Sequence, residues 1–348
     1  MMIMGSNPLA TAPLSAQAVR RAPVQRPRLL VQSAADAEDD RHRLLAGLLE
    51  RPARIEPKHF YDTQGSALYA AITRLTEYYP TRLEAQILAT HRDEIVAELP
   101  QRGQWVDLGC GDGDKVLPWL HATQARRYIA VDAAQAWLRA TIQQFSARHR
   151  DIDAIGVVAD FSSAWSLQHL LHEWSDCPPV FFYPGSSIGN FHPDDAIALV
   201  RNVRAHCRED GCLLIGVDLT RDAKPLRAAY DDALGVTAAF NRNVLRVANR
   251  MLDADFDPHR FAHVARFNEH ESRVEMHLMS RERHTVRFGT PADTRRNFEL
   301  GETIFTECSY KYSAKGFADM LDVAGFTHHQ LWTSGDAAPS FGVFLAKP

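Results

Sequence analysis

Glycine and acidic residues alternate in one short segment of the chain, VDLGCGDGDK at residues 106–115. Glycine lets the main chain approach a bound molecule closely, and a carboxylate at the end of a strand can accept hydrogen bonds from that molecule. A nicotinamide-binding turn requires Gly-x-Gly-x-x-Gly, whereas the third glycine here, Gly113, comes one residue early. The segment therefore favours a nucleotide-like ligand other than NAD, and a purely structural tight turn is the alternative interpretation.

Acidic residues also end the next two predicted strands. Asp132 is the last residue of the second strand, and Asp160 is the last residue of the third and is followed directly by Phe161. An acid about 20 residues beyond a glycine-rich turn is placed to accept hydrogen bonds from ribose hydroxyls, and an acid beside an aromatic ring can hold an adenine. Each acid alone is more typical of a helix cap or a loop, but three strand ends in succession predict an adenosine pocket. Because the chain has no Gly-x-x-x-x-Gly-Lys-Ser/Thr motif, S-adenosylmethionine fits this pocket better than ATP.

The elements that position these residues alternate between strand and helix. Apolar runs predict strands at 104–109, 127–132, 154–160, 179–185 and 212–219, with a helical pattern between each pair. This alternation predicts an α/β fold, a parallel sheet with helices on both faces and a ligand at the carboxyl ends of its strands. Two more strands, at 328–334 and 341–347, would complete a Rossmann-like sheet of seven strands.

The alternation stops after Leu219, where two helical stretches precede three runs that look antiparallel. This change predicts a second, smaller α+β lobe. We expect a disordered N-terminal tail over residues 1–40, a substrate-binding lobe formed by 41–81 and 220–311, and a cofactor-binding domain formed by 82–219 and 312–348.

The composition is that of an ordinary globular protein. The chain has 348 residues, of which 45% are hydrophobic, and its 39 Lys and Arg against 43 Asp and Glu give a net charge of -4. No basic stripe favours a nucleic acid or an anionic membrane, and every apolar run is far shorter than the roughly 20 residues that cross a bilayer. The five scattered cysteines, with no Cys-x-x-Cys pair, predict reduced thiols, a cytoplasmic location and no metal site.

Six further segments have distinctive sequences. They are Phe60–Asp62 with Gly65 and Ser66, Glu77–Arg82, Pro184–Asn190, Tyr230–Asp232, Gly235–Asn243 and Thr306–Ser309. Together they resemble the histidine-specific Nα-methyltransferases of ergothioneine biosynthesis, and the resemblance extends from about residue 45 to the C-terminus. It implies a class I methyltransferase fold with two lobes, S-adenosylmethionine as the co-substrate and L-histidine as the substrate. The implied product is hercynine, which is histidine with three methyl groups on its α-nitrogen.

The same resemblance implies a role for individual residues. Those that contact the cofactor would be Gly109, Lys115, Asp132, Asp160 and Phe161. Those that hold the carboxylate and amine of the substrate would be Tyr78, Asn190 and Tyr230, and those that hold its imidazole would be Glu307 and Ser309. Tyr61 would lie near the amine, so Tyr61 and Tyr78 are the candidate catalytic residues.

Methyl transfer from a sulfonium to an amine chiefly requires a neutral nitrogen lone pair aimed at the methyl group, and positioning supplies most of the rate. Hydroxyl and amide groups such as those of Tyr78, Tyr230 and Asn190 can orient the substrate without adding a competing cation. An α-amine has a pKa of about 8, so it must lose a proton before each transfer. The sequence identifies no dedicated base.

We expect Glu307 to define the substrate, because a buried carboxylate opposite an imidazole N–H forms a directional, charge-assisted hydrogen bond that an indole satisfies only in part. The alternative is a strand residue paired with a neighbour such as Lys311. For Tyr78 and Tyr230 the alternative is aromatic core packing, and for Asn190 it is a loop cap.

Other functions are compatible with parts of this pattern. An N-methyltransferase of the same fold could act on another amino acid, such as a tryptophan derivative, and a regulatory protein could bind S-adenosylmethionine without turnover. A nucleic-acid methyltransferase is disfavoured, because the chain has no Asp/Asn-Pro-Pro-aromatic motif. We expect a monomer that acts on a small molecule and has no nucleic-acid or membrane partner.

Overall fold

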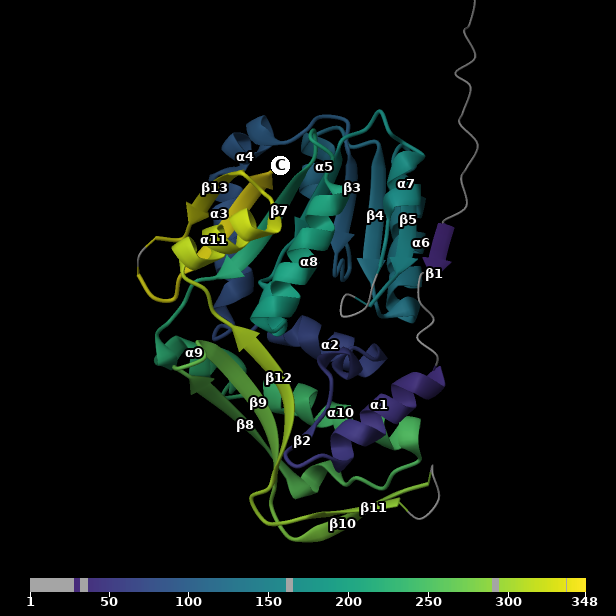
Figure 1. Ribbon diagram of the computed structural model, residues 1–348, viewed down its shortest axis with the longest axis vertical. Helices are drawn as coiled ribbons and strands as arrows, with labels where there is room; N and C mark the ends of the chain where they lie inside the picture. The colour runs from purple at the N-terminus through teal and green to yellow at the C-terminus, as the bar shows by residue number, and fades with distance from the viewer. Residues whose placement is uncertain (1–27, 32–36, 161–164, 290–293, 336) are drawn as a thin grey trace, which may run out of the picture.

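The computed structural model describes residues 28–31, 37–160, 165–289, 294–335 and 337–348 (Figure 1). An eight-stranded sheet forms the upper half of the molecule in this view, and a smaller four-stranded sheet with its own helices forms the lower half. The two halves meet at the carboxyl ends of the parallel strands, which is the edge where the sequence predicts ligand binding.

The large sheet has the strand order β1-β5-β4-β3-β6-β7-β14-β13, and all its pairings are parallel except the two made by β14. Its strands are β1 (Arg28–Val31), β3 (Gln104–Leu108), β4 (Arg127–Asp132), β5 (Asp153–Val158), β6 (Pro179–Tyr183), β7 (Cys212–Asp218), β13 (His328–Thr333) and β14 (Phe341–Lys347). The seven strands expected from the sequence are all present, which confirms the Rossmann-like α/β fold.

The eighth strand, β1, differs from the expectation of a disordered tail over residues 1–40. It pairs in parallel with the outer edge of β5, and Leu29 and Leu30 pack against opposite faces of the sheet. Gly156 on β5 makes room for this strand, because a Cβ there would lie 2.8 Å from the side chain of Leu29. The prolines and arginines of this region are typical of a disordered segment, so the short apolar strand among them was not predicted from the sequence. Residues 1–27 lie outside the described part of the chain.

Helices cover both faces of the large sheet because the side chains of each strand point alternately to either side. Val106 and Leu108 pack under one group of helices, whereas Trp105 packs under the other. The first group consists of α7 (Gln168–His172), α8 (Pro193–His206) and α11 (Ala314–Ala324). The second group consists of α3 (Tyr79–Thr90), α4 (Arg92–Glu98), α5 (Leu117–Ala122) and α6 (Gln135–Arg148).

The smaller sheet has the order β2-β12-β9-β8. Its strands are β2 (Ala53–Arg54), β8 (Phe261–Asn268), β9 (Arg273–Ser280) and β12 (Thr303–Tyr310), and a separate hairpin consists of β10 (His284–Phe288) and β11 (Thr294–Phe298). In β9 every second side chain is buried, which is the pattern of a sheet covered on one face. The helices of this lobe are α1 (Ala37–Leu49), α2 (Thr63–Ile72), α9 (Ala223–Tyr230) and α10 (Val236–Leu252), with the 3₁₀ turns η1 (Pro57–Phe60) and η3 (Pro258–Arg260).

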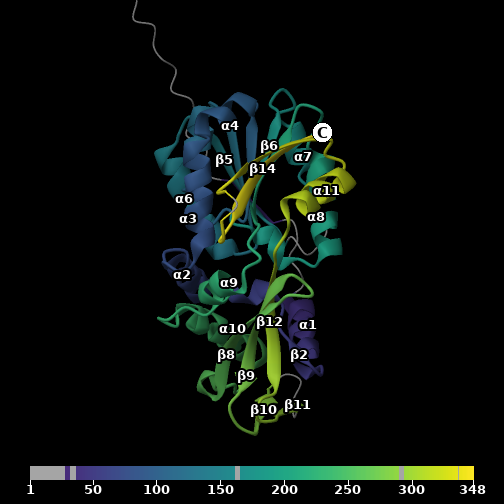
Figure 2. The same cartoon turned by 90° about the vertical axis from the view of Figure 1, so that its left-hand side faces the viewer.

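Strand β12 joins the two lobes. Figure 2 shows it rising from the small sheet toward α11, which lies on the large sheet. The 3₁₀ turn η2 (Ser187–Asn190), which follows β6, packs tightly on this strand, because a Cβ on Gly189 would lie 2.7 Å from the carbonyl oxygen of Tyr310. The end of β12 is therefore held against the loops that follow β6 and β7.

Candidate active site

The glycine-rich segment turns sharply where β3 ends. Gly109 and Gly111 have φ angles of 70° and 55°, in the left-handed region that side chains disfavour. Among the described residues, a Cβ placed on either glycine would meet no atom within 4 Å, so they leave open space in front of this turn. The arrangement fits the cofactor expected from the sequence, because a ligand could approach the main chain here without a side chain in the way.

The two predicted acids lie at the ends of the neighbouring strands. Asp132 ends β4 and accepts a hydrogen bond from the main-chain N–H of Ala134 at 2.8 Å. Burial raises the pKa of Asp132, and main-chain N–H groups oppose the shift. Asp160 follows β5, and its carboxylate lies 3.7 Å from the ammonium of Lys58 in η1. Because β3, β4 and β5 are adjacent, both acids lie at the same edge as Gly109, whereas Phe161 falls outside the described residues.

Lys115 has a partner that the sequence analysis did not identify. Its ammonium donates to a carboxylate oxygen of Glu84 at 2.9 Å, and the other oxygen of Glu84 accepts a hydrogen bond from the N–H of Gly185 at 2.6 Å. The side chain of Glu84 is 2% exposed and that of Lys115 is 42% exposed. Lys115 therefore lies between the glycine-rich turn and the loop after β6, still partly open to solvent.

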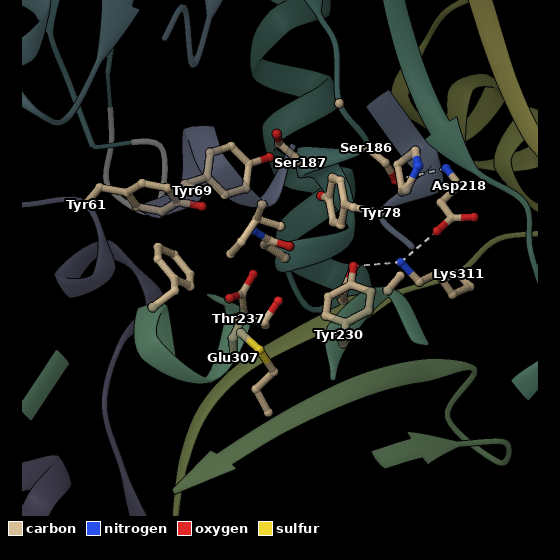
Figure 3. Close-up of a pocket in the computed structure, with 18 residues that line it drawn as sticks. Tyr61, Tyr69, Tyr78, Ser186, Ser187, Asp218, Tyr230, Thr237, Glu307 and Lys311 are labelled. Carbon is tan, nitrogen blue, oxygen red and sulfur yellow. Dashed lines mark hydrogen bonds and ion pairs between the residues drawn. The ribbon is translucent and has the colours of Figure 1, made fainter. Parts of the chain in front are cut away.

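One cavity with about 570 Å³ of empty space lies between the two lobes (Figure 3). All six residues expected to bind or act on the substrate line it: Tyr61, Tyr78, Asn190, Tyr230, Glu307 and Ser309. They come from helices, turns and strands that are far apart in sequence, and Figure 3 shows the labelled ones arranged around a common space. The fold thus brings together the predicted substrate residues.

Glu307 and Ser309 are alternate residues of β12, so their side chains leave the strand on the same face. Glu307 is 7% exposed, and among the described residues none forms a hydrogen bond with its carboxylate. Burial raises the pKa of Glu307 to about 7, and the nearby charge of Lys311 opposes this shift. Burying an acid without a hydrogen-bond partner costs free energy, and a ligand with an N–H group would reduce this cost by donating to the carboxylate.

Aromatic rings form much of the opposite wall. Tyr61 packs edge-on against Tyr69 and Phe240, with ring centroids 5.8 and 6.0 Å away, and Tyr78 packs edge-on against Tyr230 at 6.4 Å. Burial raises the pKa of Tyr61 and of Tyr78 well above the ordinary value of tyrosine. Both hydroxyls therefore keep their protons, which suits them to hydrogen bonding rather than to a role as a resident base.

Asn190 reaches the cavity through the loop after β6. Ser186 begins this loop with a φ of 59°, and its hydroxyl accepts a hydrogen bond from the main-chain N–H of Asp218 at 2.9 Å. Gly189 then lets η2 lie against β12, as described above. Asn190 is consequently fixed from both sides, by the end of β7 and by the strand that carries Glu307.

A buried ion pair closes one end of the cavity. The ammonium of Lys311 lies 2.9 Å from the carboxylate of Asp218, and these two side chains are 1% and 0% exposed. Tyr79 donates its hydroxyl hydrogen to the same carboxylate at 2.7 Å. The alternative considered for Glu307, an ion pair with Lys311, is therefore not what the structure contains, because Lys311 pairs across the lobes with the last residue of β7.

The cavity also includes residues that the sequence analysis did not select. These are Tyr69, Ile72, Pro80, Gly185, Ser186, Ser187, Asp218, Ala229, Thr237, Phe240, Met276 and Lys311. Several of them belong to the distinctive segments given in the sequence analysis. Those segments indicated a functional region but did not show which of their side chains point into the cavity. Nothing in the sequence pairs Asp218 with Lys311, which become neighbours only through the fold.

No group of three or more His, Cys, Asp and Glu side chains able to hold a metal ion occurs in the described part of the chain. Within the same residues, every helix is too short or too polar to cross a lipid bilayer.

Comparisons with known proteins agree on one family. Residues 40–348 match the family described as histidine-specific methyltransferase, SAM-dependent. Histidine N-alpha-methyltransferases of Mycobacterium tuberculosis and Mycolicibacterium smegmatis are each 39% identical to this chain, over 88% and 91% of its length and 94% and 97% of theirs. A 4-dimethylallyltryptophan N-methyltransferase of Trichophyton verrucosum is 26% identical over 83% of this chain and 88% of its own. The chain therefore belongs to the family of histidine-specific, S-adenosylmethionine-dependent methyltransferases.

Proposed function

We propose that this chain transfers methyl groups from S-adenosylmethionine to the α-amine of L-histidine, up to three in succession, and so forms hercynine for ergothioneine biosynthesis. The observation that carries this proposal is the cavity in which the six residues expected to bind or act on the substrate meet. The names of the two relatives at 39% identity support the choice of histidine.

The residues around the glycine-rich turn would hold the co-substrate, which supplies a methyl group on a positively charged sulfur. Gly109 leaves space for it, and Asp132 offers a carboxylate to the ribose hydroxyls. Asp160 and Phe161 would hold the adenine, and Lys115 would hold the carboxylate of the methionine portion. These assignments combine the family resemblance with the placement of the described residues at one edge of the sheet.

The substrate residues would fix the amino acid so that its nitrogen lone pair points toward the turn. In this proposal Tyr78, Asn190 and Tyr230 bind the carboxylate and the amine, and Tyr61 lies beside the amine. Because both Tyr61 and Tyr78 keep their protons, the proton that the amine loses before each transfer passes to water. The rate then comes chiefly from the orientation of the substrate in the cavity.

Selection for histidine would rest on β12. The carboxylate of Glu307 would accept a hydrogen bond from one imidazole nitrogen, and Ser309 would bond with the other. A tryptophan derivative is the second candidate substrate, supported by the relative that is 26% identical. An indole has a single N–H and no ring acceptor, so it would leave one of these two groups without a partner.

Mass spectrometry tests the proposal directly. The purified chain is incubated with S-adenosylmethionine and either histidine or tryptophan, and added methyl groups are counted over time. We expect histidine to gain one, two and then three methyl groups. Methylation of tryptophan alone would refute the substrate and the roles of Glu307 and Ser309. Cofactor binding without methylation of either amino acid would instead indicate a regulatory protein.

We also propose a cytoplasmic monomer with a substrate-binding lobe formed by residues 41–81 and 220–311 and a co-substrate-binding domain formed by 82–219 and 312–348. Asn190 would reach the substrate from the second of these. The five cysteines are all free and buried, which is compatible with a reducing compartment. Light scattering of the eluting protein should give the mass of a single chain, 39.1 kDa.

A further inference from the structure

Lys311 lines the cavity next to Tyr230 and Ser309 (Figure 3). Its ammonium donates to the carboxylate of Asp218 at 2.9 Å, to the hydroxyl of Tyr230 at 3.0 Å and to the hydroxyl of Ser309 at 2.9 Å. An ammonium has three hydrogens and no acceptor, so these three partners use all its hydrogen-bonding capacity. Lys311 therefore has no free N–H to donate to a ligand.

The hydroxyl of Ser309 is constrained by this arrangement. It accepts one hydrogen bond from Lys311 and a second from the hydroxyl of Tyr230 at 2.8 Å. A serine oxygen accepts two hydrogen bonds and donates one. Because both acceptor positions are occupied, the remaining capacity of Ser309 is its own hydrogen, and the side chain lines the cavity.

Asp218 keeps Lys311 in this role. Its carboxylate receives the ammonium, the hydroxyl of Tyr79 and, at 3.0 Å, the main-chain N–H of Thr220. A fully buried ammonium is stable only when it is paired in this way. The cation is thus fixed to the end of β7, and it cannot turn toward the substrate.

We propose that Lys311 is a positioning residue that fixes the direction of the Ser309 hydroxyl, so that β12 offers a substrate ring one acceptor at Glu307 and one donor at Ser309. This inference rests on the proposed function, which places the ring between these two residues. The ring that satisfies both groups is a neutral azole with one N–H and one unprotonated nitrogen. Imidazolium has no unprotonated nitrogen, and indole and pyrrole have only the N–H.

Binding of matched ring analogues tests the role of Lys311. The two 3-(pyrrolyl)alanines, attached at ring position 2 or 3, keep one ring N–H and replace the other nitrogen with C–H. Calorimetry at about pH 8, where imidazole is neutral, gives the dissociation constant of each analogue and of histidine in the presence of S-adenosylhomocysteine. The dissociation constant of each analogue divided by that of histidine measures how strongly the site requires an acceptor nitrogen in the ring.

Three variants separate positioning from folding. Lys311→Met combined with Asp218→Asn removes both charges, Ser309→Ala removes the donor, and Tyr79→Phe removes a hydrogen bond from the far side of Asp218 while leaving Lys311 in place. We expect the ratio to fall about tenfold in the first two variants, because the hydroxyl is then free to turn or is absent. In Tyr79→Phe we expect the ratio of the unchanged protein.

The readout distinguishes each failure. Binding of S-adenosylhomocysteine shows whether a variant is folded. If the double variant is not folded, Lys311→Gln is measured in its place, and we expect a smaller fall in the ratio of dissociation constants. An unchanged ratio in a folded Lys311 variant, with histidine and the analogues weakened equally, overturns the positioning role. If the unchanged protein binds histidine but does not methylate it, the proposed function fails while the role of Lys311 is still measured.

Discussion

The ammonium of Lys115 lies 2.9 Å from a carboxylate oxygen of Glu84. Since the second oxygen of Glu84 binds the N–H of Gly185, one acid on α3 holds both the lysine expected at the co-substrate and the loop that leads to Asn190. The acid has room only because the neighbouring residue of β7 is Gly216, where a Cβ would collide with it. Glu84 is therefore a structural link between the two binding regions.

Replacing Glu84 by Gln tests this link. Gln keeps the shape and an acceptor for Gly185 but removes the charge that faces Lys115. We expect the dissociation constant for S-adenosylhomocysteine, measured by calorimetry, to rise about tenfold, since a charge-assisted hydrogen bond is lost. Glu98→Gln is the control, because it breaks an exposed ion pair with Lys347 and should have little effect. Equal affinities in the two variants would contradict the prediction.

Glu307→Gln should lower kcat/KM for histidine by about tenfold to a hundredfold, because the charge-assisted hydrogen bond to the ring becomes a neutral one. Glu307→Ala should lower it further and should improve the relative turnover of tryptophan. Steady-state kinetics with both amino acids give these values. Glu271→Gln, on the exposed turn before β9, should behave like the unchanged protein. Unaltered histidine turnover in Glu307→Ala would remove this residue from the substrate site.

The pKa of Glu307 also predicts a pH dependence of stability. Burial raises this pKa from 4.5 to about 7, so between these values the folded chain holds a proton that the unfolded chain has lost. The contribution of Glu307 to stability is therefore greatest at low pH and is lost as the pH rises through about 7. Relative to Glu307→Gln, the unchanged protein should lose on the order of 2–3 kcal/mol of unfolding free energy between about pH 5 and about pH 8. Denaturant titrations at both pH values measure this, and a constant difference would show that Glu307 is not buried as described.

Two glycines allow a controlled test of the cofactor turn. Gly109 and Gly235 have nearly the same φ, 70° and 71°, and a Cβ on either would meet no atom within 4 Å. Substitution by Ala should therefore destabilise the protein similarly in both cases, by about 1–3 kcal/mol. Only Gly109→Ala should also weaken binding of S-adenosylhomocysteine, because its methyl group would occupy the space in front of the turn. If both variants bind equally well, Gly109 does not contact the co-substrate.

The large sheet was predictable because its strands are continuous apolar runs separated by helical patterns. The sequence analysis placed β4 and β14 at their observed bounds and the other five expected strands within two residues of theirs. The strands of the small lobe were harder to predict from the sequence. Strand β11, with the sequence TRRNF, has four polar residues in succession, and β12 was noticed only as a motif around Glu307. Strand β1 was not predicted, because a run of four residues is too short to show a strand pattern in the sequence unless its partner strand is known.

The residues expected to bind the substrate came from a family resemblance that pointed to each of them, and the fold brings them to one cavity. The contacts behind them could not be predicted. Glu84 meets Lys115 across 31 positions of the chain, and Lys311 meets Asp218 across the junction of the lobes. Neither pair has a local pattern, because an ion pair between distant segments leaves no periodicity in the sequence.

The pairing of β1 with β5 has a consequence for the protein in concentrated solution. Without β1, the main-chain N–H and C=O groups along the outer edge of β5 would be available to a strand from another molecule. The opposite edge of the sheet, β13, is protected differently, by the polar side chains of His328, His329 and Gln330. Because β1 has only four residues, it presents a shorter free edge than the six-residue β5 would, and this disfavours intermolecular strand pairing.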